Sequence, residues 1–271
     1  MRPFAVKFDK PVAPRKGKMI TALLWGDTHF PSQDDSAIAV VFGVLKRLQP
    51  TVMVHMGDLC DAYSLSRFDK DPARKESLQD EINMARAHLA QARKISPNSR
   101  MIFLEGNHEN RMQRAMWQMD GPAAQLGKLT AFQKAITWPK LLDLESLHCE
   151  FYQYGEQSKK HLLPKFILKH GSLVRSKSAY TAAGEHEKYG KSGASGHTHR
   201  LGVFYRRDAN GSHVWVETGT TARLDPEYVV DPNWEQGCVV LTFEPTTGAV
   251  SVEPIYIHEG MGVWRGEVYR A

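Results

Sequence analysis

Cysteine is scarce in this chain of 271 residues, which contains only Cys60, Cys149 and Cys238. An odd number of cysteines without the spacing of metal ligands argues against a disulfide framework and against a thiolate metal site. Chains of this kind are typical of a reducing compartment, so the sequence predicts a cytoplasmic location.

Long hydrophobic runs are also missing. The longest, over residues 37–45, is about half the length that a membrane-spanning helix needs. The N-terminus has no apolar stretch followed by a cleavage site, so no signal peptide is expected. We therefore expect no membrane partner.

Positive charge is concentrated at the N-terminus. The chain has 35 Lys and Arg against 30 Asp and Glu, a net charge of +5. Residues 1–18 contain six basic residues and one acidic residue, so this segment carries the whole surplus. We predict a basic tail over residues 1–18 and a single domain over residues 19–271. The tail makes nucleic acid a candidate partner.

The first half of the chain alternates short apolar runs with longer amphipathic ones. Strands are predicted over residues 19–25, 51–56 and 100–105, and helices over residues 35–49 and 77–95. Strand and helix in alternation imply parallel strands joined by right-handed crossovers.

The second half has a different pattern. Residues 110–148 are predicted to be mostly helical, with breaks at Gly121-Pro122 and Pro139. Short strands follow over residues 166–169, 193–196, 201–207, 213–217, 238–243 and 249–256, with a hairpin turn at Asn210-Gly211. No linker separates the halves, which favours one α/β domain with two packed sheets.

Chemically active side chains follow the ends of several predicted strands. The five segments are Asp27-Thr28-His29, Gly57-Asp58, Gly106-Asn107-His108-Glu109, His170-Gly171 and Gly196-His197-Thr198-His199. Each segment alone is better explained as a turn or a helix cap, and His170 as a hydrogen-bonded histidine of the core. Because ligands bind at the carboxyl ends of strands in open α/β sheets, we expect the segments to converge.

The ordered set D-x-H, G-D, G-N-H-E, H and G-H-x-H resembles the calcineurin-like metallophosphoesterase superfamily. The likeness covers about residues 19–257, and the loop over residues 63–72 with the block over residues 106–112 most resembles bacteriophage and prophage members. The resemblance implies two mixed sheets flanked by helices, an αββα sandwich. It would place a phage-encoded chain in the host cytoplasm.

The resemblance also implies a role for each site residue. Asp27, His29 and His199 would hold one metal ion, Asn107, His170 and His197 would hold the other, and Asp58 would bridge the two. His108, next to a ligand, would protonate the leaving oxygen or stabilise the equatorial phosphate oxygens, and Asp61 would orient His108.

The donor set itself favours two divalent metal ions as cofactors. Imidazole, carboxylate and amide oxygen suit first-row ions, with Mn²⁺ expected first and Fe, Ni or Zn as alternatives. Two such ions can activate a hydroxide for in-line attack. With two carboxylates among the ligands, about two positive charges would remain, which favours an anionic phosphate.

One departure from the related Ser/Thr phosphatases concerns the substrate. Those enzymes have an Arg that binds phosphate directly after the position of Asp61, whereas this chain has Ala62. Arg67, Arg111 and Arg200 flank the motifs and could replace it. Because a monoester dianion loses one expected positive contact at Ala62, we expect a phosphoesterase that prefers phosphodiesters, in nucleic acid or nucleotides. A phosphomonoesterase and a non-catalytic binding scaffold remain the alternatives, and the sequence leaves the oligomeric state open.

Other histidines and the tryptophans have simpler interpretations. His88 falls on the polar side of its predicted helix and is expected to be exposed. His55 lies inside a strand and is expected in the core or beside the site. Core or sheet packing is the expected role of the six tryptophans.

Overall fold

The computed structural model describes residues 19–67, 69–72, 74–159, 162–163, 165–226 and 231–271. The predicted basic tail, residues 1–18, lies outside the described residues. None of the described helices is long and apolar enough to cross a lipid bilayer.

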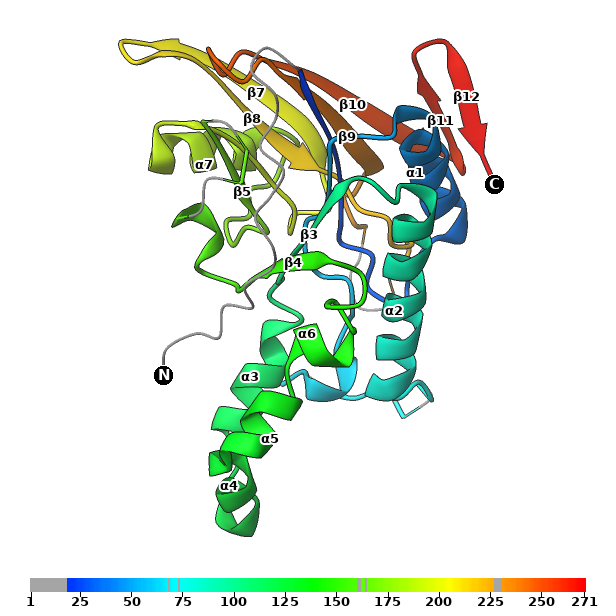
Figure 1. Ribbon diagram of the computed structural model, residues 1–271, viewed down its shortest axis with the longest axis vertical. Coiled ribbons are helices and arrows are strands. Elements are labelled where there is room, and N and C mark those ends of the chain that lie inside the picture. Colours follow the sequence, from blue (N-terminus) through cyan, green and yellow to red (C-terminus); the bar gives the residue numbers. More distant parts are fainter. Residues whose placement is uncertain (1–18, 68, 73, 160–161, 164, 227–230) are drawn as a thin grey trace.

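An eight-stranded mixed sheet forms the larger half of the fold, in the order β12-β11-β10-β9-β1-β2-β3-β4 (Figure 1). Its strands are β1 (Ile20–Trp25), β2 (Val52–His55), β3 (Arg100–Leu104), β4 (Cys149–Tyr152), β9 (Gln236–Phe243), β10 (Val250–His258), β11 (Met261–Trp264) and β12 (Glu267–Arg270). Strands β1 to β4 are parallel, as the strand and helix alternation predicts, and β9 to β12 add antiparallel pairs.

A four-stranded mixed sheet packs against the first, in the order β5-β6-β8-β7. Its strands are β5 (Phe166–Lys169), β6 (Ser192–Ser195), β7 (Leu201–Asp208) and β8 (Gly211–Thr218). Strands β5, β6 and β8 are parallel, and β7 pairs with β8 in the antiparallel hairpin predicted at Asn210-Gly211.

Capping residues determine where the two long helices begin. Helix α1 (Asp35–Leu48) begins after Asp34, whose carboxylate accepts the backbone N–H of Ser36 at 2.9 Å. Helix α2 (Leu78–Ile95) begins with a reciprocal capping box between Ser77 and Asp80. Such caps satisfy N–H groups that have no partner within the helix.

Successive side chains of a strand face opposite sides of its sheet, so each strand contributes to two layers of the core. In β1, Leu23 and Trp25 join the core cluster that also holds the buried faces of α1 and α2. Ala22 and Leu24 face the other way and join the cluster between the two sheets. Helix α7 (Tyr180–Tyr189) covers the outer face of the smaller sheet, where its Ala182 packs on the buried side chains of that sheet. The structure therefore confirms the predicted arrangement of two mixed sheets flanked by helices.

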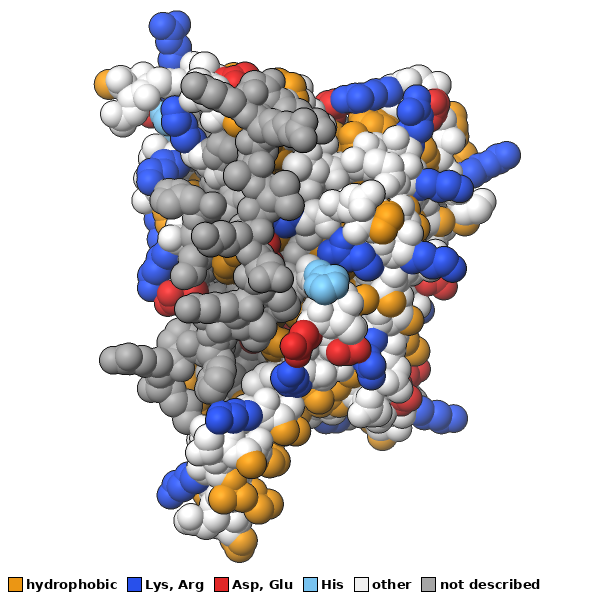
Figure 2. Space-filling model, in the orientation of Figure 1, with side chains coloured by type: hydrophobic (Ala, Val, Ile, Leu, Met, Phe, Trp, Pro, Cys, Tyr) orange, Lys and Arg blue, Asp and Glu red, His pale blue; other side chains and the backbone are white. Residues whose placement is uncertain are grey.

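Four short helices follow β3 in the region predicted to be mostly helical. They are α3 (Asn110–Trp117), α4 (Gly121–Lys128), α5 (Thr130–Ala135) and α6 (Trp138–Leu141). Helices α3 to α5 project from the body of the molecule (Figure 1). Apolar side chains gather on this projection (Figure 2), where Trp117, Leu126 and Leu129 are exposed.

Two expectations need correction. His88 is buried rather than exposed, and its Nε2 accepts a hydrogen bond of 3.1 Å from Trp25 Nε1. The imidazole fills the space between α2 and the first sheet, where Phe30 and Phe42 pack on it. Among the tryptophans, Trp117 is 70% exposed and therefore does not pack in the core.

Candidate metal centre

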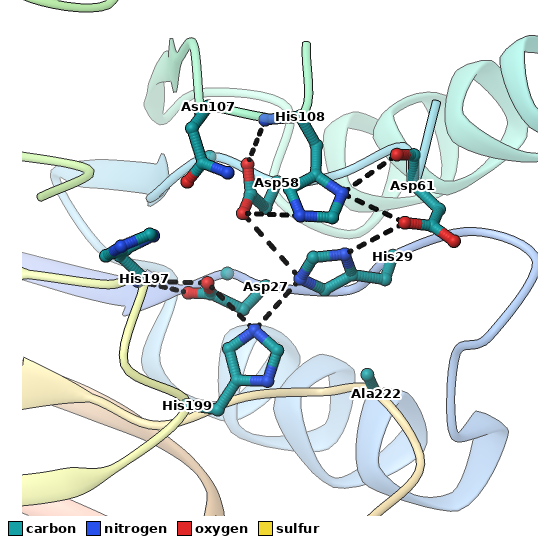
Figure 3. A network of polar contacts seen from close by, with 12 residues as sticks. Asp27, His29, Asp58, Asp61, Asn107, His108, His197, His199 and Ala222 are labelled. Atoms are coloured by element: carbon teal, nitrogen blue, oxygen red, sulfur yellow. Dashed lines mark hydrogen bonds and ion pairs between the residues drawn. The ribbon is translucent and has the colours of Figure 1, made fainter. Parts of the chain in front are cut away.

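The predicted site residues come from loops that directly follow strands of both sheets (Figure 3). Asp27 and His29 follow β1, Asp58 follows β2, Asn107 and His108 follow β3, His170 follows β5, and His197 and His199 follow β6. Because these strand ends meet at one edge of the sandwich, residues far apart in the sequence converge.

The backbone is strained at this edge. Five of the site residues have the left-handed conformation, with φ values of 50° at Asp27, 51° at His29, 49° at Asp58, 72° at His197 and 55° at His199. Non-glycine residues adopt this region at a cost of about 1–3 kcal/mol each and concentrate at functional sites. Hydrogen bonds between the loops stabilise this backbone conformation, among them the bond from the Asp27 N–H to the Gly57 carbonyl at 2.9 Å.

One group of donors consists of Asp27, His29 and His199, whose ligand atoms lie within 4.8 Å of one another. The Nε2 atoms of His29 and His199 are 2.9 Å apart, and His199 Nε2 is 3.5 Å from Asp27 Oδ1. Burial lowers the pKa of both imidazoles, which favours the neutral form that binds metal ions.

A second group consists of Asp58, His170 and His197. Asn107 Oδ1 joins it, 3.0 Å from His170 Nε2. His170 Nδ1 donates to the Met56 carbonyl at 2.9 Å, which leaves Nε2 to face the other donors. Metal-binding histidines are oriented in this way by a carbonyl behind them.

The two histidines of the second group have pKa values that are shifted in opposite directions. Burial opposes a charge on His170, but the carboxylate of Asp58 raises the pKa of His170 to about 9. Burial and the nearby His170 lower the pKa of His197 to about 4. A cation at this group would replace the proton that Asp58 stabilises on His170.

Asp58 lies between the two groups. Its Oδ2 is 3.2 Å from His170 Nε2 and 3.7 Å from His29 Nε2. Its Oδ1 accepts the backbone N–H of His108 at 2.9 Å, which fixes the carboxylate. Although burial opposes ionisation, the charge of His170 holds the pKa of Asp58 well below its usual value.

These donors fit a pair of first-row divalent ions. Ligands bound at about 2.0–2.2 Å to one ion lie about 3.0–3.5 Å from each other. The distances within the groups, 2.9 Å between His29 and His199 and 3.0 Å between His170 and Asn107, are close to this spacing. Four imidazoles, two carboxylates and an amide oxygen converge here without a thiolate, a donor set that suits first-row divalent ions.

His108 and Asp61 form a pair beside these donors. His108 Nδ1 contacts Asp61 Oδ1 at 2.9 Å and the Asp61 carbonyl at 2.8 Å. Burial favours the neutral ring, but the charge of Asp58 and the hydrogen bond to Asp61 raise the pKa of His108. Arg74 Nη1 donates to Asp61 Oδ2 at 3.0 Å and so holds the other carboxylate oxygen.

The three arginines proposed to replace the missing phosphate ligand have different surroundings. Arg111 contacts the Asp61 carbonyl at 2.8 Å and His108 Nε2 at 3.0 Å, so it lies at the site. Arg200 is buried and donates to the Thr198 carbonyl. Arg67 is exposed on the loop after β2.

Glu109 is a site residue to which the sequence reasoning gave no role. Its buried carboxylate accepts the backbone N–H groups of Asp58 at 2.9 Å, Cys60 at 2.8 Å and Gly106 at 2.8 Å. It therefore ties together the loops that present Asp58 and Asn107. The only signal in the sequence was its place in the G-N-H-E block.

A cleft of about 220 Å³ opens beside the first group, with His29, Asp61 and His199 in its wall. Its other side chains were not predicted. They include Arg74, Arg223, Asp225 and Trp234. Nothing in their sequence spacing connects these residues with the motifs, so only the tertiary structure reveals them.

Comparison with known proteins found sequence relatives in phages. No family model matches the chain. The Gene 54 protein of Mycobacterium phage D29 is 26% identical over 235 residues, and the Gene 54 protein of Mycobacterium phage L5 is 28% identical over 237 residues. Each match covers 80% of this chain and 87% of the relative. Neither name states an activity.

Solved structures resemble the chain at low sequence identity. Vacuolar Protein Sorting 29 from Cryptosporidium parvum has a TM-score of 0.41 at 15% identity, covering 93% of this chain and 96% of its own. The phosphoesterase YfcE from E. coli has a TM-score of 0.36 at 12% identity, covering 86% and 98%. Purple acid phosphatase PPD1 from yellow lupin has a TM-score of 0.43 at 14% identity, covering 95% and 54%. The chain is thus similar to two phage proteins of unstated activity, and its chemistry has to be inferred from its own residues.

Proposed function

We propose that this protein is a dinuclear metal-dependent phosphoesterase of the calcineurin-like superfamily that hydrolyses phosphate esters and prefers diesters. The observation that carries the proposal is the position of Asp58 between two groups of donors. One carboxylate that faces His29 on one side and His170 on the other is suited to two neighbouring cations.

Each group would hold one divalent ion, with Mn²⁺ expected first. Asp27, His29 and His199 form the first group, His170, His197 and Asn107 form the second, and Asp58 belongs to both. Such ions supply Lewis acidity toward phosphate oxygens and activate water. The chain itself supplies fixed donors, because strained loops and buried hydrogen bonds hold them before the substrate arrives.

His108 is the proton donor in this proposal. Its Nδ1 is held by Asp61, so a proton on Nε2 would face the donors and the leaving oxygen of a bound ester. The hydrogen bond from Nδ1 to the Asp61 carboxylate favours the protonated ring, which would keep that proton available near neutral pH. Arg111 donates to the same Nε2 at 3.0 Å, so a bound ester would have to take over this N–H before Nε2 can carry the proton. The guanidinium would then face the phosphate, where negative charge develops.

The preference for diesters rests on the absence of an unengaged arginine at the expected place. Ala62 is fully buried and presents no side chain to the site. Arg111 lies nearby, but it contacts Asp61 and His108. A monoester dianion needs more positive charge than a diester, so this arrangement favours the singly charged diester.

The test uses protein stripped with a chelator and reloaded with Mn²⁺. Rates on bis(p-nitrophenyl) phosphate and p-nitrophenyl phosphate are compared, and the diester is expected to react faster. A monoester preference of more than about tenfold would establish the phosphomonoesterase alternative instead. If no phosphate ester is hydrolysed with Mn²⁺, Fe²⁺, Ni²⁺ or Zn²⁺, the scaffold alternative replaces the proposal.

A further inference from the structure

We propose that the cleft beside His199 binds a nucleotide unit of single-stranded nucleic acid, with its base against Trp234 and its neighbouring phosphate on Arg223. This inference rests on the proposed phosphoesterase activity and names the class of substrate. It depends on side chains that are not among the predicted metal ligands.

Trp234 is positioned by the same backbone that carries a predicted metal ligand. The next residue, Glu235, donates its N–H to the His199 carbonyl at 2.8 Å, and its own carbonyl accepts from Thr220 at 3.1 Å. The Trp234 ring lies 4.2 Å from the His199 ring, centroid to centroid, at an angle of 63°. A flat aromatic group therefore lines the cleft in direct contact with the candidate metal centre.

Four of the six tryptophans satisfy their Nε1–H within the fold, namely Trp25, Trp138, Trp215 and Trp264. Neither Trp117 nor Trp234 makes such a hydrogen bond to any residue that the structure describes. Of these two, Trp234 is the one that lines the cleft, and it is only half-buried. A partly exposed indole in a cleft offers a surface on which a base can stack, and stacking of this kind accepts every base.

Arg223 provides a cation at the rim of the same cleft. Its backbone N–H donates to the Ser32 carbonyl at 2.9 Å, and nearby Thr220 Oγ1 donates to the Asp27 carbonyl at 2.6 Å. The segment is thus attached to the loop that carries Asp27. Within the described parts of the chain, the Arg223 guanidinium has no ion-pair partner, and the residue is exposed.

The position of Arg223 decides which phosphate it contacts. It lies at the exposed rim rather than among the donors, so it is suited to a phosphate next to the one that is cleaved. One guanidinium group can donate two parallel hydrogen bonds to two oxygens of a phosphate, and this geometry is strongly directional. An aromatic platform and a cation beside a hydrolytic centre together match a strand of nucleotides better than a small aliphatic ester.

Three substrates with one leaving group separate the two contacts. Methyl p-nitrophenyl phosphate has neither a base nor a second phosphate. Thymidine 5′-(p-nitrophenyl phosphate) adds the base, and its 3′-phosphorylated form adds the neighbouring phosphate. In the wild-type protein, kcat/KM is expected to rise at each step.

Trp234→Ala should abolish the first rise, by about 5- to 100-fold, so that in this variant the thymidine ester reacts no faster than the methyl ester. Arg223→Ala should reduce only the second rise. Trp117→Ala and Arg206→Ala are the matched controls, because both residues are exposed and neither lines the cleft. An equal loss on all three substrates in Trp234→Ala would show that the indole only supports His199, and would overturn the proposal.

A binding measurement keeps this inference separate from the proposed activity. Calorimetric titration of the Mn²⁺-loaded protein with thymidine 3′,5′-bisphosphate should give weaker binding in Trp234→Ala and in Arg223→Ala than in the two controls. If no ester is hydrolysed but this difference is found, the phosphoesterase proposal fails and the nucleotide subsite stands. Equal affinities in all four variants would refute the subsite.

Discussion

His29 Nε2 and His199 Nε2 lie 2.9 Å apart although 170 residues separate them in the sequence. His29 follows a strand of the larger sheet and His199 follows a strand of the smaller one. The candidate metal centre therefore joins the two sheets at their common edge. A cation held by both imidazoles would link the layers of the sandwich as well as provide a site for chemistry.

Asp58→Asn tests the bridging position. The substitution keeps the shape of the side chain but removes the charge that faces both donor groups, so metal content should fall at both sites and not at one alone. Elemental analysis after loading with Mn²⁺ measures this. Asp120→Asn, an exposed aspartate without a side-chain capping bond, serves as the control. Normal metal content in Asp58→Asn would contradict the bridging position.

His108→Ala tests the proton donor. Turnover of bis(p-nitrophenyl) phosphate should fall by about 10²- to 10⁴-fold, which is the usual contribution of a positioned general acid. Metal content should stay near that of the wild type, because the seven predicted ligands are intact. The exposed His258 provides the matched variant, His258→Ala, which should behave as the wild type. Unchanged turnover in His108→Ala would exclude the role.

Glu109→Gln tests the buried carboxylate that holds the loops together. Its two oxygens serve three backbone N–H groups, and the amide would turn N–H donors toward at least one of them. A buried donor without an acceptor costs about 1–3 kcal/mol, so the free energy of unfolding should fall by that amount. Urea unfolding of the metal-free protein measures it, with the exposed Glu187→Gln as the control.

The same variant should also bind Mn²⁺ more weakly, because Glu109 positions the loops that present Asp58 and Asn107. If Glu109→Gln unfolds at the same urea concentration as the wild type and binds Mn²⁺ equally well, the carboxylate does not organise the site.

His88→Gln tests a contribution of a buried histidine to stability. Burial lowers the pKa of His88 to about 3 in the folded protein, against an ordinary value of 6.5. Between these values the unfolded chain binds one more proton than the folded one, so falling pH destabilises the fold from about pH 6.5 downward. Glutamine accepts the same Trp25 hydrogen bond but does not titrate.

The decrease in unfolding free energy from pH 7 to pH 5 should therefore be about 2 kcal/mol smaller in His88→Gln than in the wild type. Urea unfolding at the two pH values measures the difference. His258→Gln, in which an exposed histidine is lost, should retain the wild-type dependence. The same decrease in His88→Gln as in the wild type would show that His88 titrates normally.

Local patterns predicted much of the fold. The apolar runs and caps of the first half correspond closely to β1, α1, β2, α2 and β3, because helix caps and alternating burial are properties of neighbouring residues. Strands β4, β11 and β12 and helix α7 were not predicted. Burial alternates along β11, but its exposed residues Met261 and Val263 are apolar, so the sequence shows no alternation of polar and apolar residues. Strand β12 has no buried residue and exposes Val268.

The site was predictable to a similar extent. The order of its motifs identified nine residues that lie together in the structure. Eight of them are labelled in Figure 3, and the ninth, His170, is 3.2 Å from Asp58. Their roles as ligands and as acid remain predictions. His88 was assigned to the wrong environment because helical position alone does not reveal which aromatic side chains close over a polar face.

By itself, the sequence determined which kinds of donor are present, in which order they occur and that each follows a strand. Only the tertiary structure decided which donors share a group, that Glu109 ties their loops together, and that Trp234 and Arg223 line the same cleft as His199. The physical reason is that strand and turn preferences act between neighbours in the chain. Distances across the site are set by the packing of two sheets, to which residues far apart in the sequence contribute.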